Sequence, residues 1–313
     1  ADPDLDARPR MATLGPLTQE LVMLQSRAVF AAVVLGIATL AAATPAHAET
    51  KLTATSFTGS PAGFLVTSTL IAGDKDAILI DAQFDLADAH RLVAMILESK
   101  KNLTTVYITH FHPDHYFGLA VVQQAFPKAK LVALPATVAE IKKTWQDKVK
   151  QWGPMYGELL PAKPVLPVAL AGTTLTLEGQ PLEVHGGVQG DAADNSYVWI
   201  PSIKAVVAGD VLYRGVHAWT RETTAAQRKA WRKTLDEIAA LKPEVVIAGH
   251  KDPKAKDDAG GIDWTRNYLE TFDGAVASSK TSAEAQQKVK AKYPDAQLDV
   301  ILSLGADAAF PAK

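Results

Sequence analysis

Four side chains that bind metals well lie within six consecutive residues, at His110, His112, Asp114 and His115. They follow an apolar run typical of a buried strand, and Pro113 marks the point where a helix would begin. In extended backbone, side chains two residues apart point to the same side, so His110 and His112 can hold one cation together. Asp114 and His115 can face a second cation, which in paired sites lies about 3.5–4 Å from the first. The spacing therefore predicts a centre for two metal ions.

The composition limits both the metal donors and the class of partner. The 313 residues include no cysteine, so imidazole and carboxylate groups alone must supply the ligands. A content of 48% hydrophobic and 21% charged residues is typical of a globular protein with a sizeable core. The formal net charge of −2 offers no basic field for a polyphosphate backbone. We therefore expect a small-molecule substrate and no nucleic acid partner.

The metal-binding segment is embedded in alternating strands and helices. In the first half, apolar runs predict strands at 52–57, 64–70, 77–80, 105–108 and 130–133, and amphipathic spacing predicts helices at 86–100, 118–126 and 137–152. In the second half, strands are predicted at 173–177, 182–184, 196–200, 205–208 and 244–248, with helices at 224–241, 264–275 and 282–293. Runs of strands separated by helices favour a layered α/β domain.

The first 48 residues are predicted to be a leader that ends in a signal peptide. After Arg27 the chain is apolar from Ala28 to Ala43, and Ala46-His47-Ala48 presents small residues where a signal peptidase reads them. The run is shorter than the roughly 20 strongly apolar residues of a membrane-spanning helix, which disfavours an uncleaved anchor. We expect cleavage after Ala48 and a periplasmic or secreted bacterial protein without a membrane anchor. The catalytic domain would then be 49–313, with 263–313 as a helical tail packed on it.

The pattern H-x-H-x-D-H at residues 110–115 resembles the signature of the metallo-β-lactamase superfamily, whose later landmarks also occur in order along the chain. The resemblance implies an α/β fold, the four-layer αββα sandwich, with two mixed β-sheets flanked by helices. It is closest in kind to the hydrolases related to glyoxalase II, lactonases and β-lactamases. It makes Asp81 the aspartate that supports the motif from behind, Asp210 the carboxylate that bridges both metals, and His250 the last ligand of the second metal.

The remaining ligand of the first metal departs from the family pattern. Most relatives place a histidine in a Gly-His segment before a strand, whereas here Gly190 is followed by Asp191 and, further on, by Asp194-Asn195. This register favours Asp191, while His185 stays open as an alternative ligand because imidazole is the commoner type. With Asp191, three carboxylates and one hydroxide would balance the charge of two dications. Such a site would admit manganese or iron beside zinc, which is the default metal.

The resemblance further implies hydrolysis of an ester, lactone or amide by a hydroxide held between two metals, with Asp114 orienting the water or accepting its proton. Many β-lactamases hold the substrate carboxylate with a lysine three residues after the bridging aspartate. Here that position is Tyr213, with Arg214 as a substitute cation, so a lactonase or esterase is favoured over a β-lactamase. Weaker candidates for the substrate pocket are Tyr116, His217 and Trp219. Phosphate- or sulfate-ester hydrolysis, an iron-loaded redox enzyme and a binding protein without turnover stay open.

Overall fold

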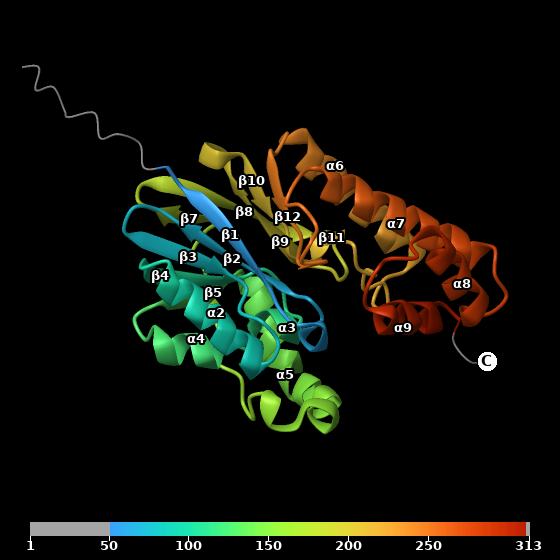
Figure 1. The fold of residues 1–313 in the computed structure, drawn as a ribbon, viewed down its shortest axis with the longest axis horizontal. Helices are drawn as coiled ribbons and strands as arrows, with labels where there is room; N and C mark the ends of the chain where they lie inside the picture. Colours follow the sequence, from blue (N-terminus) through green and yellow to red (C-terminus); the bar gives the residue numbers. More distant parts are fainter. Residues whose placement is uncertain (1–50, 311–313) are drawn as a thin grey trace, which may run out of the picture. The chain divides into compact units, whose positions relative to one another are not determined.

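Two mixed β-sheets, packed face to face, form the centre of the computed structural model, which describes residues 51–310 (Figure 1). The first sheet has the order β1 (Thr53–Thr58), β2 (Thr67–Ala72), β3 (Asp76–Ile80), β4 (Asn102–Ile108), β5 (Lys130–Ala133) and β6 (Val168–Ala169). The second has the order β12 (Val245–Ile247), β10 (Ala205–Val207), β9 (Asn195–Ile200), β8 (Gln180–Val188) and β7 (Thr174–Leu177). A short parallel pair joins β11 (Tyr213–Arg214) to β13 (His250–Lys251). The predicted signal peptide lies outside the described residues.

Helices cover the outer face of each sheet (Figure 1). The first sheet packs on α2 (Leu86–Glu98), α3 (Pro113–Tyr116), α4 (Leu119–Ala125) and α5 (Pro135–Tyr156). The second packs on α6 (Ala225–Ala240) and α7 (Gly260–Ala277), while α8 (Ser282–Lys292) packs against α7 and α9 (Asp299–Ala309) packs against α8. Apolar side chains fill all three interfaces, one between the sheets and one beneath each helical layer. The predicted αββα sandwich is therefore confirmed. No helix within residues 51–310 is both long and apolar enough to cross a membrane.

The parallel pairing of β3 and β4 explains why the candidate metal-binding residues lie together at one end of the first sheet. Successive side chains of a strand face opposite sides, so Leu79 and Val106 enter the helical core while Ile80 and Tyr107 enter the core between the sheets. The register pairs Ile80 with Tyr107. Asp81 and the motif of residues 110–115 therefore leave their strands side by side.

Three of the local differences from the sequence-based expectation lie near the candidate site. The strand predicted from residue 64 begins at Thr67, because Pro61–Gly63 forms a 3-10 turn capped by Ser60 and is followed by left-handed backbone at Phe64 and Leu65 (φ 60° and 53°). The helix predicted to end at Trp152 continues to Tyr156 through a Gly-Pro pair. The final helix, α9, was not predicted, and the segment that leads into it contributes to the site described next.

Candidate metal centre

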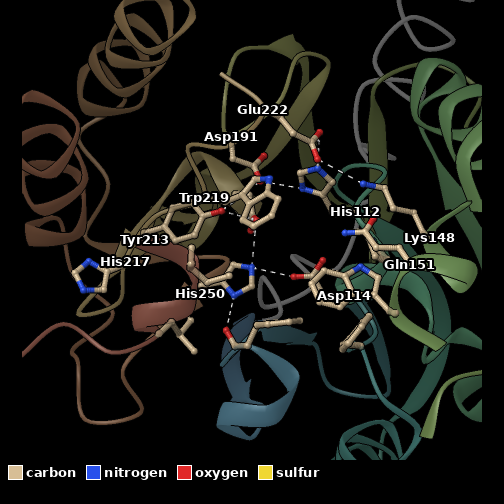
Figure 2. A pocket seen from close by; sticks show the side chains of 17 residues that line it. His112, Asp114, Lys148, Gln151, Asp191, Tyr213, His217, Trp219, Glu222 and His250 are labelled. Atoms are coloured by element: carbon tan, nitrogen blue, oxygen red, sulfur yellow. Dashed lines mark hydrogen bonds and ion pairs between the residues drawn. The ribbon is translucent and has the colours of Figure 1, made fainter. Parts of the chain in front are cut away.

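The predicted ligands come from separate segments of the chain, and Figure 2 shows His112, Asp114, Asp191 and His250 around one pocket. The loop after β4 and the first turn of α3 carry residues 110–115. Asp191 lies in the loop between β8 and β9, and Asp210 in the 3-10 turn Gly209–Val211 after β10. His250 opens β13, directly after β12 and a two-residue link. Each carboxylate or imidazole thus follows a strand that fixes its position.

The seven predicted ligands form two adjoining clusters. The first consists of His110, His112, Asp191 and Asp210, and the second of Asp114, His115, Asp210 and His250. In each cluster the candidate ligand atoms lie within 4.8 Å of one another. Asp210 belongs to both clusters, which is the geometry expected of a carboxylate between two cations.

The ring protons of His110 and His115 are directed away from the clusters by Asp81. His115 Nδ1 donates to Asp81 Oδ2 at 2.8 Å, and the Thr109 hydroxyl donates to the same carboxylate oxygen at 2.9 Å. Because that hydroxyl has used its proton, it accepts from His110 Nδ1 at 3.0 Å. Each ring therefore presents its Nε2 lone pair inward. Both Nε2 atoms are buried and make no hydrogen bond of normal geometry within residues 51–310, although His115 Nε2 lies 3.0 Å from Asp210 Oδ1, so these nitrogens fit bound cations.

His250 has the same arrangement through a backbone partner. Its Nδ1 donates to the carbonyl oxygen of Phe64 at 2.6 Å. The left-handed turn at Phe64 and Leu65 is what brings this carbonyl to the site. His250 Nε2 is left 3.2 Å from Asp114 Oδ2 and 3.2 Å from Asp210 Oδ2, inside the second cluster.

Asp210 receives a hydrogen bond from a tyrosine and packs closely against the backbone of a glycine. The Tyr213 hydroxyl donates to Asp210 Oδ2 at 2.7 Å and lies 3.3 Å from Asp191 Oδ2. A Cβ at Gly249 would lie 2.2 Å from Asp210 Oδ1, so only glycine fits there. The backbone N–H of Asp191 donates to the carbonyl of Asp210 at 3.2 Å, which ties the two acidic ligands together. Tyr213 thus orients the two carboxylates.

In the metal-free protein burial lowers the pKa of His110, whereas the neighbouring carboxylates raise the pKa values of His112, His115 and His250. Burial alone would lower the pKa of His250, but the Asp210 and Asp114 carboxylates outweigh it and raise that pKa to about 10. Burial is likewise outweighed at His112, where Asp191 and Glu222 raise the pKa to about 10. Cations must therefore displace protons from this site, so we expect metal affinity to rise with pH.

The clusters open into a pocket with largely apolar walls. One wall is aromatic, since the Phe64 ring lies 5.3 Å from Trp152 and 5.4 Å from Phe84. Leu298 and Ile301 line the pocket from the chain entering α9 and from α9 itself. Polar or amphipathic lining residues outside the clusters are Lys148, Gln151, Tyr213, His217, Trp219 and Glu222 (Figure 2).

Several sequence-based candidates are placed elsewhere. Tyr116 is fully buried in the helical core of the first sheet and is not among the residues that line the pocket. Arg214 faces Asp258 at 3.6 Å and is likewise not among them. His185 lies on β8 with its ring stacked on Tyr197 at 4.7 Å, outside both clusters, so Asp191 is the candidate that the fold brings to the site. His217 and Trp219 do line the pocket, as expected.

Glu222 and Lys148 were missed by sequence reasoning. Glu222 Oε2 lies 3.3 Å from His112 Nε2, and Lys148 Nζ lies 3.5 Å from Glu222 Oε1. Glu222 follows His112 by 110 residues in the chain and belongs to no metal-binding motif. Only the fold brings the three side chains together.

His217 is expected to make stability depend on pH between about pH 7 and pH 4. Its buried Nδ1 lies 3.0 Å from the Tyr268 hydroxyl, and burial lowers its pKa to about 4. The unfolded chain binds this proton near pH 6.5 and the folded chain only near pH 4, so acidification favours unfolding. Urea unfolding of metal-free protein should show a loss on the order of 2 kcal/mol from this residue between pH 7 and pH 4.5. His217→Gln should flatten that dependence, and an unchanged slope would contradict the assignment.

Comparisons with known proteins agree with this geometry. The model of the "Metallo-beta-lactamase superfamily" matches residues 61–250. A "Metallo-beta-lactamase type 2" of Bacteroides fragilis is 28% identical over 190 residues, covering 58% of this chain and 68% of that protein. One of Bacillus cereus is 24% identical over 180 residues, covering 56% and 63%. A metallo-beta-lactamase family protein of Thermus thermophilus shares the fold with a TM-score of 0.59 at 19% identity, covering 83% of this chain and 91% of that one. The chain therefore belongs to the metallo-beta-lactamase superfamily.

Proposed function

We propose that this protein hydrolyses a small ester, lactone or amide at a centre of two divalent cations, with zinc as the default metal. One observation carries the proposal: two four-residue donor clusters share Asp210, and His110, His115 and His250 each turn Nε2 toward these clusters while Nδ1 faces an outer partner. When bound, such a pair of cations supplies an ionised water near neutral pH and polarises a carbonyl oxygen.

Asp114 is the residue suited to handle the proton of the attacking water. Burial would raise its pKa, but His115 and His250 hold that pKa well below its usual value, so the carboxylate stays ionised. Its Oδ2 lies 3.2 Å from His250 Nε2, and the side chain borders the pocket. An ionised carboxylate at that point can accept a hydrogen bond from the water and orient it toward the carbonyl carbon.

The pocket favours a substrate with an apolar group next to its carbonyl. Among the described residues that line it, Lys148 is the only lysine or arginine, and it already faces Glu222. A β-lactam needs a partner for its carboxylate, so a neutral ester or lactone suits these walls better. β-Lactam hydrolysis is the second candidate, because both curated relatives carry the name of β-lactamases.

Metal analysis combined with a substrate panel tests the proposal. We expect two divalent ions per chain, hydrolysis of an aryl ester or lactone, loss of this activity with a chelator, and recovery with zinc. The panel should include a β-lactam, a phosphotriester and a sulfate ester. One iron-containing centre with a visible absorption band would favour the redox alternative, and a chain that takes up no metal would overturn the hydrolase.

A further inference from the structure

Glu222 lies against the outer edge of the first cluster, at the ring of His112 (Figure 2). The two nitrogens of this ring have different neighbours. Nδ1 lies 2.9 Å from Asp191 Oδ2, inside the cluster, whereas Nε2 lies 3.3 Å from Glu222 Oε2. His112 therefore differs from His110, His115 and His250, whose outward nitrogen is Nδ1.

We propose that Glu222 is a positioning residue that keeps the ring proton of His112 on Nε2 and leaves the Nδ1 lone pair for the first cation. The inference rests on the two-cation site proposed above. A neutral imidazole carries one ring proton, and an acceptor beside one nitrogen decides which nitrogen is free to bind a metal. Asp81, the Thr109 hydroxyl and the Phe64 carbonyl fix the other three rings in this way. Glu222 does the same for the fourth ring, that of His112.

The loop that carries Glu222 is held in place on both sides of it. The backbone N–H and the hydroxyl of Thr223 both donate to the carbonyl of Thr220, at 3.1 and 2.9 Å. Arg228 Nη1 donates to the carbonyl of Thr223 at 2.6 Å, and Thr224 caps the start of α6. A carboxylate on such a turn has a defined position, which a positioning residue requires.

Lys148 gives Glu222 a second contact and therefore a competing explanation. Its Nζ, on α5, lies 3.5 Å from Glu222 Oε1, so the pair also links α5 to the loop before α6. Removing either partner would break that link equally. Only removal of Glu222 would affect the tautomer of His112, so variants of the two residues separate the roles.

Metal affinity measured site by site tests the inference. The experiment compares wild type with Glu222→Ala, Glu222→Gln and Lys148→Met, using competition with a chromophoric chelator for zinc and the visible spectrum of the cobalt-loaded protein. We expect Glu222→Ala to weaken one of the two metal equivalents by about 10- to 100-fold, the usual cost of losing a carboxylate behind a ligand histidine. The other equivalent should not change. Glu222→Gln, which retains an acceptor oxygen, should recover most of the lost affinity.

Glu140→Ala serves as the matched control. Glu140 is another glutamate nearby on α5, and it faces Lys143 at 3.1 Å instead of a histidine. Its removal, like that of Lys148, should leave both metal equivalents and the cobalt spectrum unchanged. Unaltered affinity in Glu222→Ala, or an equal loss in Lys148→Met, would overturn the role of Glu222 while leaving the two-cation site standing. Wild-type protein that binds no metal would instead overturn the site itself.

Discussion

Asp210→Ala should abolish hydrolysis and prevent both cations from binding tightly. Asp210 is the one residue common to the two donor clusters within the described chain, and the residue is 1% exposed. The loss of activity should exceed the ~10²- to 10³-fold typical of removing one donor to a transition state, because the variant lacks a ligand for both ions. Zinc content per chain and the steady-state rate on the best substrate of the panel provide the measurement.

The variant needs a control for folding, because Asp210 also receives the Tyr213 hydroxyl. Asp210→Asn keeps the shape and one acceptor oxygen, so it should fold as wild type does and still lose metal. Asp147→Ala removes an exposed aspartate on α5 and should change neither metal content nor rate. Two tightly bound ions in Asp210→Asn would show that this carboxylate does not bridge them.

Asp191→Ala should remove the first cation and spare the second. The side chain is fully buried and contributes to the first cluster alone. Zinc affinity at that site should fall by more than the about 10- to 100-fold cost of losing a residue that only supports a ligand. Competition with a chelator should then detect one tight equivalent per chain, and the rate of hydrolysis should fall with the loss of the other.

His185→Ala is the matched comparison for Asp191→Ala. His185 was the alternative ligand from sequence, but its ring is stacked on Tyr197 and its Nε2 lies 3.6 Å from Glu183. Its removal should leave both metal equivalents in place. Loss of one equivalent in His185→Ala, with full occupancy in Asp191→Ala, would reverse the assignment.

The fold, and the residues that it brings together as candidate metal ligands, could be predicted because both are encoded in local patterns. Apolar runs such as 77–80 and 105–108 mark buried sheet, and the spacing of His110 and His112 at a strand end indicates a shared metal. Asp191 could be chosen over His185 from the turn residues that follow it, and the structure places Asp191 in the first cluster.

The pocket walls could not be predicted, because they depend on contacts between distant segments. Glu222 belongs to no sequence motif, and only its contact with the His112 ring points to a role at the site. The tail was expected to serve packing alone, yet Leu298 and Ile301 line the pocket. Tyr116 was expected to line the pocket because it directly follows the motif. Instead, the helical turn of α3 directs its side chain into the core.

The backbone contacts of Gln297 hold the C-terminal segment of the described chain against the pocket. His217 N–H donates to the carbonyl of Gln297 at 2.9 Å, and the N–H of Gln297 donates to the carbonyl of Gly215 at 3.0 Å. This pairing seats Leu298 beside the pocket, although Leu298 lies beyond the 61–250 segment that matches the superfamily and contains every candidate metal ligand. Chimeras that exchange only the C-terminal segment from residue 297 onward should therefore redirect substrate preference without disturbing the ions, a modular route by which related enzymes can diversify.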